Sequence, residues 1–114
     1  MPIDFEDTAA GIRYIKISGR LDILGSGEID AKFASLAATE KHRLIVDLTA
    51  VTFLASIGIR SIISNAKAQH QRGGKMVLFV GENTSVANTL EMTGIDALVP
   101  MFKDILEAEK SVLE

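Results

Sequence analysis

Apolar and polar positions along this chain follow two different periods, which take turns from the first residues to the last. Five short segments show the alternation or the compact apolar runs that are typical of β-strands: residues 3–5, 11–18, 44–48, 76–80 and 98–100. Four longer segments repeat apolar residues every three to four positions, as amphipathic helices do: residues 26–39, 57–71, 83–93 and 102–113. This order predicts an α/β fold with a mixed, mostly parallel sheet of four or five strands and about four helices packed on it.

Local signals refine this prediction. The first two strands follow each other without a helix between them, which predicts an antiparallel hairpin at the start of the sheet. Residues 20–24 are expected to be a short extended piece, and residues 25–27, Gly-Ser-Gly, a break before the first helix, with Ser26 at its N-terminus. A turn is expected after Leu48. The length of the chain predicts one domain, residues 1–114.

Composition and charge exclude several classes of function. A net charge of −3 argues against nucleic acid binding, and the absence of cysteine excludes disulfides and thiolate chemistry. His42 and His70 have no carboxylate or second histidine at ligand spacing, so neither a metal nor a cofactor is expected. The apolar runs are too short to span a membrane and the acidic start does not resemble a signal peptide, so we expect a cytoplasmic protein without direct membrane contact.

No group of residues forms a convincing catalytic site. Asp47 ends the central strand, where a phospho-aspartyl receiver would carry its acceptor, but the first strand lacks the acidic residues that would bind magnesium. The turn from Gly81 to Ser85 opens a helix and could hold an anion, although it lacks a Walker lysine. Neither histidine is placed for a hydrolytic triad. We therefore expect no enzymatic activity.

Ser56 is the most informative polar residue, because it stands with Gly58 where the second long helix begins. A hydroxyl there lies close to free backbone N–H groups and to the positive end of the helix dipole. The residues alone leave two interpretations open. Ser56 is a helix cap, which is the more frequent role of such a serine, or it is a phosphate acceptor that a partner recognises, with Gly58 allowing a close backbone approach.

Four motifs resemble the STAS domain of bacterial anti-sigma factor antagonists. In chain order they are a turn at 18–22, a strand and helix start at 45–59, a glycine turn into a strand at 73–78 and a helix end at 86–95. The resemblance implies partner switching. The unphosphorylated antagonist binds a serine kinase of the histidine-kinase-like ATPase class, which is also the anti-sigma factor and phosphorylates one serine. A PP2C-type phosphatase removes the phosphate.

The resemblance also assigns roles to residues. The acceptor position is Ser56, and the implied partner surface comprises Asp22, Leu54, Ile57, Gly58, Ile59 and Arg60. Three positions depart from the family pattern and imply a distinct set of partners: Ala55 replaces an Asp, Ile57 a small residue and Arg60 a glycine. Two alternatives remain, a scaffold of this fold that is never phosphorylated and a small-ligand or nucleotide-binding module that uses the turn from Gly81 to Ser85.

Overall fold

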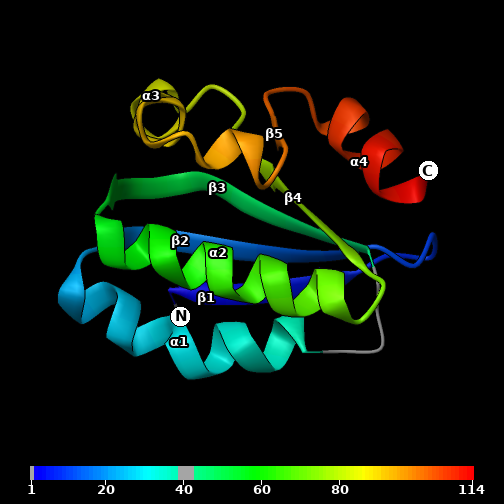
Figure 1. Cartoon of the computed structure of the whole chain (residues 1–114), viewed down its shortest axis with the longest axis horizontal. Helices are drawn as coiled ribbons and strands as arrows, with labels where there is room; N and C mark the ends of the chain where they lie inside the picture. Colours follow the sequence, from blue (N-terminus) through cyan, green and yellow to red (C-terminus); the bar gives the residue numbers. More distant parts are fainter. Residues whose placement is uncertain (1, 39–42) are drawn as a thin grey trace.

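A computed structural model describes residues 2–38 and 43–114 (Figure 1). The predicted helix end at Thr39 and the side chain of His42 lie outside the described residues. In chain order the elements are β1 (Ile3–Asp7), β2 (Arg13–Leu21), α1 (Ile23–Ala37), β3 (Arg43–Leu54), α2 (Ser56–Gln71), β4 (Lys75–Phe79), α3 (Thr84–Thr93), a short 3₁₀ helix η1 (Ile95–Ala97), β5 (Met101–Phe102) and α4 (Ile105–Leu113). The α/β prediction is therefore confirmed, with five strands and four helices.

The sheet has the strand order β1-β2-β3-β4-β5, so each strand pairs with its neighbour in the sequence. β1 and β2 form the predicted antiparallel hairpin, in which Ile3 lies opposite Ile17. The remaining pairs, β2 with β3, β3 with β4 and β4 with β5, are parallel. Since parallel strands point the same way, β2 and β3 end at the same edge of the sheet, where Leu21 pairs with Leu54.

The helices are divided unequally between the two faces of the sheet. Leu44 and Val46 of β3 face the larger core, which also contains buried residues from α1, α2 and α3. Ile45, between them on the strand, points to the other face and packs with Val77, Ala108 and residues of α4. α1 and α2 run alongside each other across the larger core (Figure 1).

The first helix differs from the prediction. It begins at Ile23 instead of Ser26 and continues through the expected glycine break, because Asp22 caps it and accepts a hydrogen bond from the Gly25 backbone N–H at 2.9 Å. A Cβ on Gly25 would lie 1.7 Å from the carbonyl oxygen of Arg20. This glycine therefore permits a tight turn between β2 and α1 and does not interrupt the helix.

The central strand is longer than predicted. β3 continues to Leu54, and the turn expected after Leu48 does not occur. Its second half pairs with the end of β2, which itself runs past Gly19 to Leu21. The Asn83 amide also holds this half, by donating hydrogen bonds to three carbonyl oxygens of β3, those of Leu48, Thr49 and Val51, at 2.8–3.3 Å.

The C-terminal elements are shifted along the chain. Residues 98–100 were expected to be a strand, but the strand β5 is Met101–Phe102. The 3₁₀ helix η1 precedes it and packs against the core through the buried side chain of Ile95, which places the strand further along the chain. The last helix begins at Ile105 instead of Phe102, where the Asp104 carboxylate accepts a hydrogen bond from the Leu106 backbone N–H.

Candidate functional site

The ends of β2 and β3 bring the starts of two helices together. Besides the pairing of Leu21 with Leu54, the backbone N–H of Ala55 donates a 3.0 Å hydrogen bond to the carbonyl oxygen of Leu21. The first turns of α1 and α2 consequently lie at the same end of the molecule, the left end in Figure 1. Asp22 and Ser56, far apart in the sequence, are thus placed on one surface.

Ser56 is exposed and is not the cap of α2. The helix begins at Ser56 itself, and the capping position belongs to Ala55, whose methyl side chain makes no cap hydrogen bond. The capping interpretation is therefore wrong. The first backbone N–H groups of α2 have no side-chain cap, and an anion on Ser56 would lie in their favourable field.

Three of the six residues expected on the partner surface are buried. Leu54 and Ile59 belong to the larger core, and Gly58 lies against β2. A Cβ on Gly58 would come within 2.9 Å of the Leu21 Cβ and 3.1 Å of its carbonyl oxygen. The backbone that approaches this glycine is therefore that of β2 in the same chain. These residues pack beneath the surface and hold the start of α2 in place. They are not accessible to a partner protein.

The other three expected residues are accessible to a partner. Arg60 is exposed and lies one turn of α2 beyond Ser56, on the same face of the helix. Ile57 and Asp22 are half-buried. The hydrogen bond from the Gly25 N–H, followed by that from Arg20, lowers the pKa of the Asp22 carboxyl below its ordinary value. Asp22 therefore presents a negative charge beside the serine.

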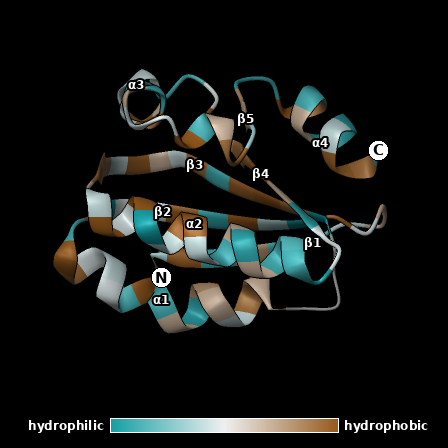
Figure 2. Cartoon of the chain, in the orientation of Figure 1, coloured by the Kyte–Doolittle hydropathy of each residue, from teal (hydrophilic) through white to brown (hydrophobic). Residues whose placement is uncertain are grey.

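The sequence analysis missed four residues that dominate this surface. Ile23, Leu24 and Phe53 are large apolar side chains that are 75%, 79% and 42% exposed. Figure 2 shows the hydrophobic start of α1 at the edge of the molecule. Arg20 lies over the Phe53 ring, 4.5 Å from the centroid, and donates a hydrogen bond to Asp22. The available signal was their position: Arg20 and Phe53 lie within the motifs at 18–22 and 45–59, and Ile23 and Leu24 directly follow the first of these motifs.

This surface is suited to docking of a protein more than to acid–base chemistry. It combines exposed apolar side chains with a fixed cation, a fixed carboxylate and a serine at a helix start. Within residues 2–38 and 43–114, no group of three or more His, Asp or Glu side chains is placed to hold a metal ion. Across the same residues, no helix is both long and apolar enough to cross a membrane.

The turn from Gly81 to Ser85, the alternative ligand site, is occupied by structural contacts. The Asn83 amide nitrogen binds β3, and its side-chain oxygen accepts a hydrogen bond from the Val86 backbone N–H at 3.3 Å. The charged side chain of the turn is Glu82, which is exposed and would repel a phosphate group. The geometry of this turn gives little support to nucleotide binding.

Comparison with known proteins gives a consistent result. The chain is 22% identical over 100 residues to the anti-sigma-F factor antagonist RsfB of Mycobacterium tuberculosis, which covers 86% of this chain and 79% of RsfB. An anti-sigma factor antagonist from Mycobacterium paratuberculosis has the same fold, with a TM-score of 0.81, 22% identity and coverage of 98% and 93%. The phosphorylated form of the Bacillus cell fate determinant SpoIIAA superimposes with a TM-score of 0.67, 14% identity and coverage of 96% and 98%.

A family model describes most of this chain. The model of the STAS domain matches residues 7–108, which include β2 to β5, the last residue of β1 and the surface around Ser56. The sheet order and the helix placement agree with the fold expected from the sequence motifs. The chain therefore belongs to the STAS domain family.

Proposed function

We propose that this protein is an anti-sigma factor antagonist that works by partner switching, with Ser56 as its phosphate acceptor. The observation that carries the proposal is the position of Ser56, exposed at the first residue of α2 and free of a capping role. The names of the relatives, antagonists of anti-sigma factors, support the class of partner. The protein acts in the cytoplasm by binding and has no catalytic activity of its own.

The unphosphorylated surface binds the partner through its apolar side chains. Ile23, Leu24 and Phe53 would lose their contact with water, and large aliphatic and aromatic side chains contribute about 1.5–3 kcal/mol each when fully buried. The partner is a serine kinase of the histidine-kinase-like ATPase class that is also the anti-sigma factor. Arg60 and Asp22 add charges of opposite sign, which orient the complex.

Phosphorylation would reverse this preference without unfolding the chain. A phosphate on Ser56 adds about −1.5 to −2 charge. In the free protein, water and the N-terminus of α2 stabilise that charge. In the complex it would be removed from water beside apolar side chains, which costs several kcal/mol unless the partner supplies a cation. A PP2C-type phosphatase would restore the binding-competent form.

The test uses the full chain, the kinase of this class from the same organism, and ATP. We expect intact-mass measurement to show one added phosphate and peptide mapping to place it on Ser56, with a lower affinity for the kinase afterwards. Ser56→Ala should bind and remain unmodified. Ser64→Ala, an exposed serine in the same helix, is the matched control and should behave as the wild type. Phosphate on Ser61, Ser64 or Ser85 with Ser56 unmodified would contradict the assignment.

The same experiment separates the alternative of a scaffold that is never phosphorylated. Such a scaffold would bind its partner with equal affinity before and after incubation with ATP, and its mass would not change. Full affinity after stoichiometric phosphorylation of Ser56 would also reject partner switching while leaving the STAS fold unaffected.

A further inference from the structure

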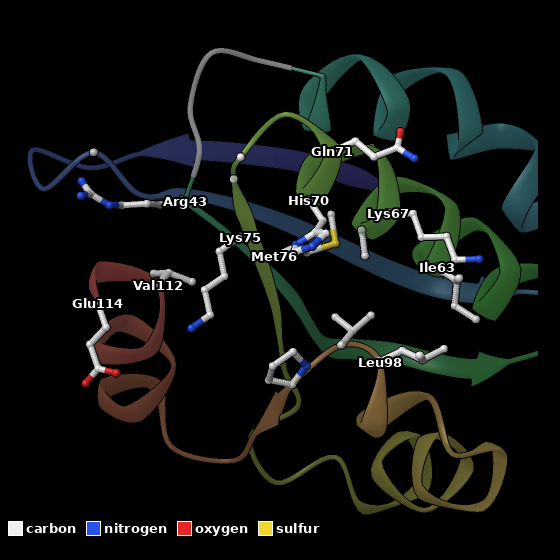
Figure 3. Close-up of a pocket in the computed structure, with 16 residues that line it drawn as sticks. Arg43, Ile63, Lys67, His70, Gln71, Lys75, Met76, Leu98, Val112 and Glu114 are labelled. Carbon is white, nitrogen blue, oxygen red and sulfur yellow. The ribbon is translucent and has the colours of Figure 1, made fainter.

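A second concave site lies at the opposite end of α2 from Ser56. A cavity of about 990 Å³ opens between the C-terminal half of α2, the start of β4, the segment before β5 and the end of α4 (Figure 3). Its volume is at the upper end of the range for small-molecule sites. Its lining includes none of the residues assigned to the partner surface, so the cavity is independent of the proposed function.

The apolar part of the lining is entirely aliphatic. Met76 and Val99 belong to the larger core, and Ile63, Ala66 and Leu98 continue this apolar surface outward. Val112 belongs to the cluster beneath α4, on the other face of the sheet. Figure 3 shows Ile63 and Leu98 together at one end of the cavity. Among the residues that the structure describes, the lining contains no Phe, Tyr or Trp on which a nucleobase could stack. The composition therefore favours a flexible aliphatic ligand over a nucleotide.

Cationic side chains gather at the other end of the cavity. Arg43 and Lys75 lie there, on the side of α4, with His70 of α2 between them and the apolar end (Figure 3). The Lys75 ammonium donates one hydrogen bond to the Ser111 carbonyl oxygen at 2.8 Å, which leaves further N–H groups for a ligand. Lys67 adds a further basic group beside Ile63, at the opposite end of the cavity (Figure 3), and among the described lining residues the acidic side chain is that of Glu114.

This local excess of positive charge contrasts with the rest of the molecule. The whole chain has a net charge of −3, so a basic cavity is not a consequence of overall composition. Low-dielectric walls lined by one sign of charge concentrate the field inside a cleft and attract ligands of the opposite sign. At Gly73 the rim is open, since a Cβ there would meet no atom within 4 Å.

We propose that this cavity binds an amphiphile with one anionic head group and a flexible aliphatic chain, for which a medium-chain fatty acid is the simplest example. The carboxylate lies between Arg43 and Lys75. The chain runs over Met76 and Val99 toward Ile63 and Leu98. Both halves of the ligand then meet complementary chemistry, since the charge is paired and the hydrocarbon is removed from water.

The test is a calorimetric titration of the full chain with decanoate below its micelle concentration. We expect saturable binding, weaker binding of uncharged decanol, and no comparable binding of ATP. Arg43→Gln should lower the affinity for decanoate about tenfold, and Leu98→Asp, at an exposed position at the apolar end, should lower it at least as much. Lys103→Gln removes an exposed lysine outside the cavity and is the matched control, expected to leave affinity unchanged.

Several results would overturn the proposal. They are the absence of saturable decanoate binding, tighter binding of ATP than of decanoate, equal affinities in Arg43→Gln and the wild type, or binding to anionic phospholipid vesicles without binding of monomeric decanoate. Thermal denaturation of each variant ensures that a lost signal reflects the cavity and not unfolding. Lys75→Gln is the second variant and should also lower the affinity for decanoate. The Lys75 ammonium donates a hydrogen bond to Ser111 of α4, so its melting temperature is measured together with its affinity.

Discussion

Arg20 and Phe53 face each other across β2 and β3 and stack, with the Arg20 guanidinium carbon 4.5 Å from the centre of the Phe53 ring. The same guanidinium group also donates a hydrogen bond to Asp22 at 3.2 Å. Both residues of the stack belong to strands, so their positions follow from the sheet. A partner that docks beside Ser56 therefore meets a surface that is already ordered, which lowers the entropic cost of binding.

Phe53 should be an energetic centre of the partner interface. We expect Phe53→Ala to weaken kinase binding at least tenfold, because truncation of a central aromatic residue commonly costs more than about 1–2 kcal/mol of binding free energy. Calorimetry measures the affinity. Met92→Ala, at an 88% exposed apolar position on α3, is the control and should bind normally. Unchanged affinity in Phe53→Ala would move the interface away from this surface.

Ser56 should matter for binding and very little for stability. Because Ala55 holds the capping position, Ser56→Ala should change the free energy of unfolding by less than about 0.5 kcal/mol. Ser56→Asp should be at least as stable as the wild type, since a carboxylate suits a helix N-terminus, yet it should lose the kinase. Thermal denaturation and calorimetry on the same samples check both statements. A destabilised Ser56→Ala with wild-type affinity in Ser56→Asp would argue for a structural serine.

Arg60 should contribute to partner binding through its charge. It is exposed one helical turn beyond Ser56, so Arg60→Glu should weaken kinase binding while the melting temperature stays nearly constant. The control is Lys67→Glu, which makes the same charge change in the same helix but far from Ser56. Equal effects of the two variants would indicate a general effect of net charge instead of a specific contact.

Gly25 and Gly27 form a matched pair within α1. Gly25→Ala should be strongly destabilising, because the new Cβ would lie 1.7 Å from the Arg20 carbonyl oxygen and the backbone would have to move. Gly27→Ala meets no atom within 4 Å and should stabilise the helix by about 0.5–1 kcal/mol. Urea denaturation of the two variants measures the contrast. A similar effect of both would mean that the turn from β2 into α1 is looser than the structure indicates.

Asp22 should make stability depend on pH in the acidic range. Its pKa in the folded chain lies below the ordinary value of 3.8, mainly because the Gly25 N–H binds the carboxylate. The stabilisation is therefore fully present above that value and is lost as the pH falls through the folded pKa. The wild type should melt at a higher temperature than Asp22→Asn by a constant amount near neutral pH. This difference should shrink below about pH 4, as the Asp22 carboxylate becomes protonated. A pH-independent difference would show that the carboxylate charge is not involved.

The elements of this fold could be predicted from the sequence because their apolar periods are clear, as in Leu44, Val46 and Leu48 against Ile45. Several boundaries could not. The start of α1 depends on Asp22, Gly25 and the carbonyl group of Arg20, a contact between segments that no local pattern reveals. The extension of β3 to Leu54 depends on pairing with β2 and on the distant amide of Asn83.

The candidate site was predictable in place but not in composition. The motifs point to Ser56 and Asp22, and the pairing of β2 with β3 brings these two positions to the same end of the sheet. The motifs could not show that the side chains of Leu54 and Ile59 point into the core. The orientation of β3 and α2 at this edge of the sheet is set by packing against the core. For the same reason Ile23, Leu24 and Phe53 stood outside every expected apolar stripe, and only the fold reveals that they are exposed together.

The sheet order has a consequence for synthesis of the chain on the ribosome. Each strand pairs with the one made just before it, so the sheet can grow in the order of translation and little chain has to wait for a distant partner. α4 is made after all five strands and covers the face that carries Ile45 and Val77. Until it emerges, that face stays open to water and to other nascent chains. A chain truncated before Ile105 should therefore retain most of its strand pairing and be prone to aggregation.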